Sequence, residues 1–287
     1  MRSSRVCNVG EVTEAPSTVS APPAPDADFY YASLYCPPAE RSRIRALRAL
    51  HQEITAIPLA VSDRGVARVK LEWWRSEALR LAEGQSNHQL SRACLESGST
   101  GGKLSAAVLA LVAGLDRELA GHRLRDADEQ LTWYDDSFGT YYALYAPMAD
   151  AESPAAGDLA RELGCRIEIA DSLLRLKPLS RKQLYRFPDA ALAATGCSWD
   201  DLATSANTNG LARFADREAE RIILSLEDCV NAAPRTARRE NRALVTLAWL
   251  TRATLQEMRA DGCRVWLHRV ELTPIRKLWC AFRTRWS

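Results

Sequence analysis

Apolar residues recur three and four positions apart along nearly the whole chain from Phe29 onward, and alternating runs of β-branched residues are lacking. This spacing places apolar side chains on one face of an α-helix. The segment that follows Pro37 and Pro38 illustrates it, with one apolar face formed by Ile44, Leu47, Leu50, Ile54 and Ile57. The pattern therefore predicts an all-α domain.

Capping and turn residues indicate where the helices begin and end. Pro58 is suited to stop the first long helix, Ser62 and Asp63 to cap the second, and Gly84 to end it. A third helix is expected after His88. Further helices are predicted over residues 103–120, 127–146, 154–177, 199–204, 208–231 and 235–260.

The two ends of the chain differ from its middle. Residues 1–25 are rich in Ser, Thr, Ala and Pro and have no periodic apolar face, which predicts a disordered tail. Residues 26–287 are then expected to form one domain. Its last helix is predicted over residues 274–286, because Thr273 and Pro274 suit a helix start.

This last helix is amphipathic, with basic residues beside an apolar face that contains Ile275, Leu278, Trp279, Phe282 and Trp286. A terminal helix often docks such a face onto the bundle, and this is our first expectation. The alternative is a membrane contact through Ile275, Trp279, Phe282 and Trp286, because aromatic and basic residues together are typical of interfacial helices.

Composition narrows the classes of function. The chain has 287 residues with 38 Lys and Arg against 36 Asp and Glu, so its formal net charge of +2 gives no reason to expect nucleic acid as a partner. No two of the 8 Cys are closer than Cys263 and Cys280, which argues against zinc and CxxC redox sites. Phosphate-binding glycine loops, GxSxG and HExxH are absent from the sequence.

The lengths of the apolar runs in the sequence indicate where in the cell the protein is expected. The longest apolar run extends only from Ala106 to Leu115, about half of the ~20 residues that a membrane-spanning helix needs. The N-terminus lacks the apolar core of a signal peptide. We expect a cytoplasmic protein, either soluble or peripheral on the inner membrane.

Several segments in a fixed order resemble the squalene and phytoene synthases. The resemblance covers roughly residues 28–285. It rests on Asp28–Arg41, Ile44–Leu50, Leu71–Leu79, Gly84, His88, Gly139, Leu173–Arg175, Tyr185–Pro188 and Pro274–Trp279. It implies a single isoprenoid synthase-like helical bundle around a central apolar cavity.

In that family the reaction joins two prenyl diphosphates head to head, and Mg²⁺ is held by aspartates on two facing helices. The resemblance places the first set near Thr55, Ala56 and Leu59, none of which is acidic; Glu53 is the nearest carboxylate, and its helical position turns it away. The second set is replaced by Leu176–Ser180, after the matching Arg175. Both metal motifs are therefore expected to be lost.

Other carboxylates remain as weak catalytic candidates. Asp135 and Asp136 stand where the family has small residues near the cavity, and they either lie on a solvated helix face or mark a narrowed or repurposed cavity. Glu168 and Asp171 precede Arg175 by about two turns and one turn of helix, and we expect ion pairing with that arginine rather than metal binding.

A basic group lies where the resemblance implies a flap over the diphosphates. It comprises Arg175, Lys177, Arg181, Lys182 and Arg186. Arginine and lysine bind phosphate even without a metal, so these residues are candidates for diphosphate or anion binding. The alternative for the same group is an exposed loop without a ligand.

The loss of both aspartate motifs resembles the non-catalytic branch related to assembly factors of respiratory complex I. The first hypothesis is a degenerate synthase that acts as an isoprenoid-binding or assembly module, with no cofactor, and with a prenyl lipid or diphosphate, a membrane surface or a protein as partner. The second is an active Mg²⁺-dependent prenyltransferase that uses Glu53, Asp135 and Asp136.

Overall fold

A computed structural model describes residues 27–146, 154–267 and 270–284. The predicted tail over residues 1–25 and the side chain of Trp286 lie outside these ranges. The described residues form helices and turns, with no strand among them. The all-α prediction is confirmed.

The helices follow one another with short connections. The N-terminal half contains α1 (Ala27–Ala32), α2 (Pro38–Thr55), α3 (Ile57–Ala60), α4 (Arg64–Ala82), α5 (Gln89–Glu96), α6 (Gly101–Leu119), α7 (Ala127–Tyr134), η1 (Asp135–Gly139) and α8 (Thr140–Ala143). The C-terminal half contains α9 (Pro154–Leu174), α10 (Leu176–Arg181), α11 (Asp189–Ala193), α12 (Trp199–Thr204), α13 (Thr208–Ala232), α14 (Arg235–Glu240), α15 (Arg242–Ala260) and α16 (Pro274–Thr284).

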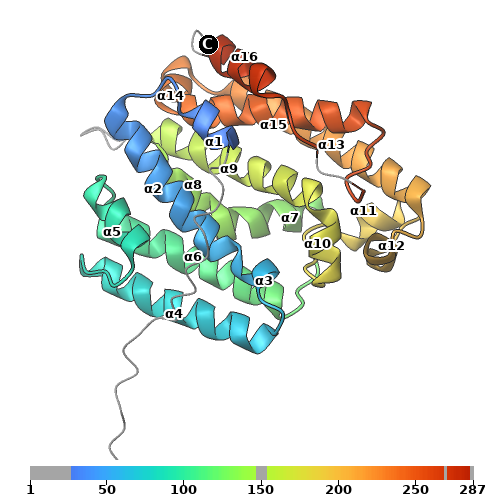
Figure 1. Ribbon diagram of the computed structural model, residues 1–287, viewed down its shortest axis with the longest axis horizontal. Coiled ribbons are helices and arrows are strands. Elements are labelled where there is room, and N and C mark those ends of the chain that lie inside the picture. Colours follow the sequence, from blue (N-terminus) through green and yellow to red (C-terminus); the bar gives the residue numbers. More distant parts are fainter. Residues whose placement is uncertain (1–26, 147–153, 268–269, 285–287) are drawn as a thin grey trace, which may run out of the picture.

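The long helices pack in two groups that share a middle layer (Figure 1). Helix α4 packs on α6 at one side, and α13 packs with α15 on α9 at the other. The segment from α7 through η1 to α8 lies between α6 and α9 and contacts both. The middle of the bundle is therefore bounded by α2, α6, α9 and this segment.

Local signals in the sequence explain most helix boundaries. The Asp63 carboxylate accepts a hydrogen bond of 2.9 Å from the Val66 N–H and caps α4. Gly84 and Gly121 follow the ends of α4 and α6 with φ of 72° and 82°, a conformation that glycine adopts without strain. The end of α4 was predicted from Gly84, and the end of α6 agrees with the predicted range of 103–120.

Some predicted helices are divided in the structure. Pro58 does not end a helix but lies in the first turn of α3, where its missing N–H is not needed. Residues 235–260 divide at the buried Asn241, whose side-chain amide donates to the backbone oxygens of Ala156 and Ala237. The predicted helix over 127–146 is interrupted by η1, a single π-helical turn.

The C-terminal helix docks differently from our first expectation. Its bundle-facing side chains are Lys277, Ala281 and Thr284, which are buried one turn apart. Lys277 pairs with Asp28 at 2.8 Å, and the Thr284 hydroxyl bonds that of Thr246 at 2.8 Å. The prediction that the apolar face packs onto the bundle is therefore wrong, because small and polar side chains let the helix approach on its other face.

One close approach fixes the middle layer against α9. The Tyr142 ring of α8 lies directly over Gly164, and a Cβ placed on Gly164 would be 2.0 Å from Tyr142 Cγ. The Tyr142 hydroxyl then reaches Glu168, one turn further along α9, and donates a hydrogen bond of 2.7 Å. Glycine at position 164 therefore makes room for the ring that bonds Glu168.

We predict that Gly164→Ala lowers the free energy of unfolding by about 1–3 kcal/mol or more, because the added methyl displaces the Tyr142 ring. Gly157→Ala is the matched control on the same helix, since a Cβ there meets no atom within 4 Å. It should be neutral or raise stability by up to about 1 kcal/mol through helix propensity. Urea unfolding measures both, and equal stability of the two variants would contradict this packing.

Candidate functional site

Charged side chains from two facing helices meet in the middle of the bundle. Arg48 and His51 lie on one face of α2, and Glu168 faces them from α9. Glu168 Oε1 lies 3.4 Å from His51 Nε2 and 3.9 Å from Arg48 Nη1. His51 and Glu168 are buried, so the opposite charges of Arg48 and Glu168 attract each other in a region of low dielectric, with the His51 ring beside them.

The neighbours of His51 determine which of its two ring nitrogens carries the proton. Arg48 Nη1 lies 3.1 Å from His51 Nδ1, and arginine can only donate, so Nδ1 accepts. In a neutral imidazole the proton then resides on Nε2, the ring nitrogen that lies 3.4 Å from Glu168 Oε1. With the Tyr142 hydroxyl on the same oxygen, Glu168 receives its polar contacts from α2 and α8.

A second buried ion pair lies beside the first. Arg186, only 5% exposed, donates to both carboxylate oxygens of Glu118 on α6, at 2.6 and 3.0 Å. It also contacts the Ser172 hydroxyl, which accepts a bond of 2.7 Å from Tyr134. Burial alone would lower the pKa of Arg186, but the Glu118 carboxylate outweighs this and raises it.

Arg175 and Asp171 pair on α9 itself. Their ion pair is 3.0 Å long and joins residues one turn apart, as predicted for Asp171. Glu168 does not join this pair, because it faces α2. Burial raises the pKa of the Asp171 carboxyl, and the Arg175 charge opposes that rise.

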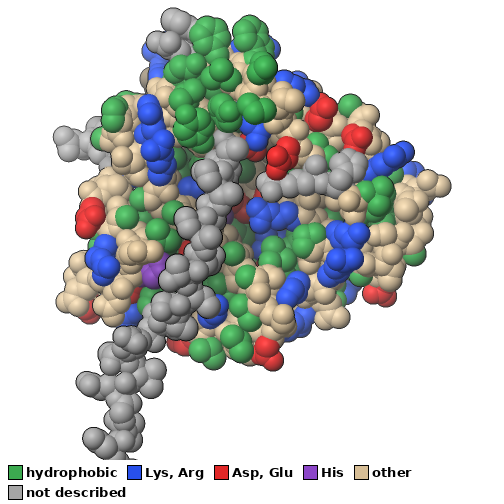
Figure 2. Space-filling view, in the orientation of Figure 1, with side chains coloured by type: hydrophobic (Ala, Val, Ile, Leu, Met, Phe, Trp, Pro, Cys, Tyr) green, Lys and Arg blue, Asp and Glu red, His purple; other side chains and the backbone are tan. Residues whose placement is uncertain are grey.

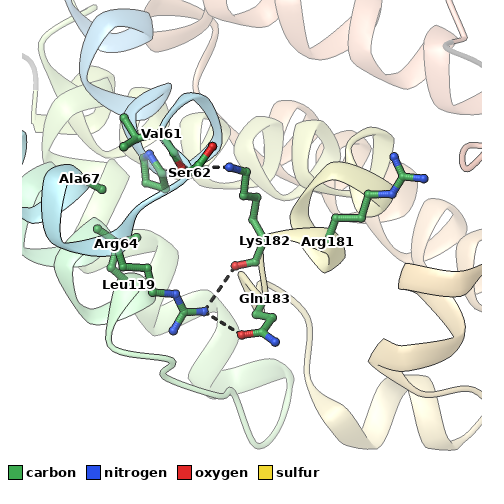
Figure 3. A pocket seen from close by; sticks show the side chains of 9 residues that line it. Val61, Ser62, Arg64, Ala67, Leu119, Arg181, Lys182 and Gln183 are labelled. Carbon is green, nitrogen blue, oxygen red and sulfur yellow. Dashed lines mark hydrogen bonds between the residues drawn. The ribbon is translucent and has the colours of Figure 1, made fainter.

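The remaining basic residues line or flank α10. Lys177 donates to the Trp266 backbone oxygen and Lys182 to that of Val61, each at 2.9 Å. Arg64 donates to the Gln183 side chain at 3.1 Å. The Lys182 and Arg64 bonds, but not that of Lys177, border a shallow pocket of about 200 Å³ between the start of α4 and the end of α10 (Figure 3).

Arg181 also lines this pocket, but its guanidinium points away from Arg64 and Lys182 (Figure 3). The predicted basic group is therefore divided. Arg186 is buried against Glu118, and Arg175 pairs with Asp171. Lys177 and Lys182 donate hydrogen bonds to backbone oxygens. The exposed Arg181 points away from Lys182. Anion binding by these five residues stays a prediction.

The carboxylate candidates do not come together. Asp135 makes a two-pronged ion pair with Arg161 of α9, at 2.5 and 2.6 Å, and Asp136 is exposed. Glu53 is exposed on α2, where its charge acts on His88 in the turn before α5. In the part of the chain that the structure describes, no three His, Cys, Asp or Glu side chains gather closely enough to hold a metal ion.

The family model for squalene/phytoene synthase matches residues 23–276. The chain belongs to this family. No curated protein sequence matches it.

Solved structures share the fold of this family member at low identity. A dehydrosqualene synthase in complex with ligand is 14% identical, with 91% of each chain covered and a TM-score of 0.72. The squalene synthase HpnC from Alicyclobacillus acidocaldarius is 19% identical, with 82% of this chain and 89% of that chain covered and a TM-score of 0.62. YisP from Bacillus subtilis subsp. subtilis strain 168 is 15% identical, with 89% of each chain covered and a TM-score of 0.55.

Several residues of this family member's central site were not singled out from the sequence. Arg48 and His51 are three positions apart, so they share a face of α2 beside the apolar residues Leu47 and Leu50. The signal in the sequence was that these charged or polar residues occupy positions beside the apolar face of the helix, where burial is expected. Glu118 could not be found in this way, because its partner Arg186 lies far along the chain.

We predict that Glu118→Gln lowers the free energy of unfolding by about 3–5 kcal/mol, because it leaves Arg186 charged and buried without a carboxylate. Asp116→Asn, on the same helix, is the matched control: Asp116 makes an exposed pair with Arg68 and should cost less than about 1 kcal/mol. Chemical denaturation measures both. An unchanged stability of Glu118→Gln would show that Arg186 is available for a ligand instead.

Proposed function

We propose that this member of the squalene/phytoene synthase family is a binding module that encloses an isoprenoid chain and does not condense prenyl diphosphates. The observation that carries the proposal is the ion-pair network between α2 and α9. A synthase needs negative charge on both facing helices, because Mg²⁺ must bind carboxylates and diphosphate together. Here α2 brings Arg48 and His51 to face Glu168.

The charge balance of this site argues for the same conclusion. Glu168 is already neutralised by cationic and hydrogen-bonding side chains, so it has little free charge to offer a divalent ion. Glu53 and Asp135 face different neighbours, namely His88 and Arg161. These donors do not fit a Mg²⁺ site.

The side chains of the middle layer also support a non-condensing role. Tyr134, Phe138, Tyr141 and Tyr142 are fully buried between α6 and α9. Large aromatic side chains at this place reduce the room for two prenyl chains. An apolar chain can still be bound by such surroundings, since its binding needs neither metal nor charge.

An assembly role, in which the bundle presents this lipid-binding fold to a protein partner, belongs to the same proposal. It follows from the resemblance to the non-catalytic branch of the family. Mass spectrometry of small molecules that copurify with the native protein would identify a bound prenyl lipid.

We predict that farnesyl diphosphate with Mg²⁺ gives no release of inorganic diphosphate and no Mg²⁺-dependent rise in Tm. A ligand present at 100 times its Kd would contribute about 2.7 kcal/mol, or a shift of roughly 5 °C or more for a domain of this size. Farnesyl diphosphate without Mg²⁺, and Mg²⁺ alone, are the controls. Turnover that requires Mg²⁺ would establish the active prenyltransferase and refute the proposal.

A further inference from the structure

The exposed face of α16 is an apolar stripe. Ile275, Leu278, Trp279 and Phe282 recur at helical spacing, and Ile275 and Trp279 are 80% and 59% exposed. The Trp279 and Phe282 rings stack on each other with centroids 6.1 Å apart. Figure 2 shows hydrophobic side chains gathered over this helix, at the edge of the molecule.

The stripe is exposed because of how the helix is anchored. Lys277, Ala281 and Thr284 face α1 and α15, and the Lys277–Asp28 pair and the Thr284–Thr246 bond hold that orientation. A rotation that buried the apolar stripe would expose these contacts to water. The bundle therefore presents the apolar side outward in its folded state.

Positive charge lies along one flank of the stripe. Arg276 and Arg283 are exposed on α16, and together with Arg252 of α15 they lie close enough to the Cys280 thiol to oppose the rise of its pKa that burial causes. Arg276 and Arg252 pair with Glu257 and Glu227, and no ion pair is described for Arg283. Such a surface suits an anionic membrane, because the apolar and aromatic side chains can enter the acyl-chain boundary while the arginines meet the charged lipid headgroups.

The shape of the surface favours a lipid occupant over a protein. Helix α16 packs on α15 and α1 at the outer edge of the bundle, so the stripe is a ridge (Figure 1). A stable protein interface needs about 20–30 residues on each side, and a ridge of four side chains offers far fewer. A bilayer deforms around such a ridge and buries it without a complementary groove.

We propose that α16 is a membrane-docking helix that inserts Ile275, Leu278, Trp279 and Phe282 into the interface of an anionic bilayer. The arginines beside the stripe then approach the lipid phosphates. Among the described residues no helix is long and apolar enough to cross a bilayer. The inference is independent of whether the protein condenses prenyl diphosphates.

Cosedimentation of the full chain with vesicles tests this proposal. Vesicles of equal parts phosphatidylcholine and phosphatidylglycerol should bind the protein, and vesicles of phosphatidylcholine alone should bind it more weakly. High salt should weaken the binding to the anionic vesicles. The variant W279S/F282S should lower the partition coefficient by about 100-fold or more, because two aromatic side chains no longer leave water.

The matched control is V69S/L79S, which removes two apolar side chains on α4 that are at least as exposed as Trp279 and Phe282. It should bind vesicles as the unaltered chain does. Both variants should keep the Tm, since the substituted side chains contact solvent. No vesicle binding by the full chain, or equal binding by W279S/F282S, would overturn the proposal. So would a dimer in light scattering that W279S/F282S converts to a monomer, because the stripe would then bind a second copy.

Discussion

The buried Glu168 carboxylate connects the elements that form the middle of this bundle. It contacts Arg48 and His51 of α2 and accepts a hydrogen bond from Tyr142 of α8, while its own helix supplies Gly164 beneath the Tyr142 ring. A buried carboxylate is costly unless opposite charge and hydrogen bonds surround it. The positions of α2, α8 and α9 are therefore set together.

This constraint has a functional consequence. In a metal-dependent synthase the charges of the facing helices are alike and are balanced only when Mg²⁺ and diphosphate bind. Here α2 and α9 carry opposite charges that balance each other, and Arg186 and Glu118 repeat the arrangement next to them. An interior that is neutral by itself suits an apolar ligand, and the chemistry at the outer face of α16 is separate from it.

Much of the fold could be predicted from the sequence, because helix periodicity and caps are local signals. Asp63 and Gly84 show this. The π-helical turn at η1 and the division at Asn241 could not, since they depend on contacts with α9. For the site, the sequence alone shows that Thr55, Ala56 and Leu59 stand where the family has acidic residues. The pairing of Glu168 with α2 and of Arg186 with Glu118 could be seen only in the tertiary structure. The outward face of α16 was mispredicted because amphipathicity alone does not say which face finds a partner.

Glu168→Gln tests the central claim most directly. If Glu168 neutralises Arg48, the substitution should lower the free energy of unfolding by about 3–5 kcal/mol, because the Arg48 charge loses its carboxylate. Glu162→Gln is the control on the same helix, because Glu162 is largely exposed and pairs with Arg166 at the surface; it should cost less than about 1 kcal/mol. Acidic residues kept for metal binding commonly gain stability when neutralised. A rise in the stability of Glu168→Gln would therefore contradict the account and indicate a retained metal site.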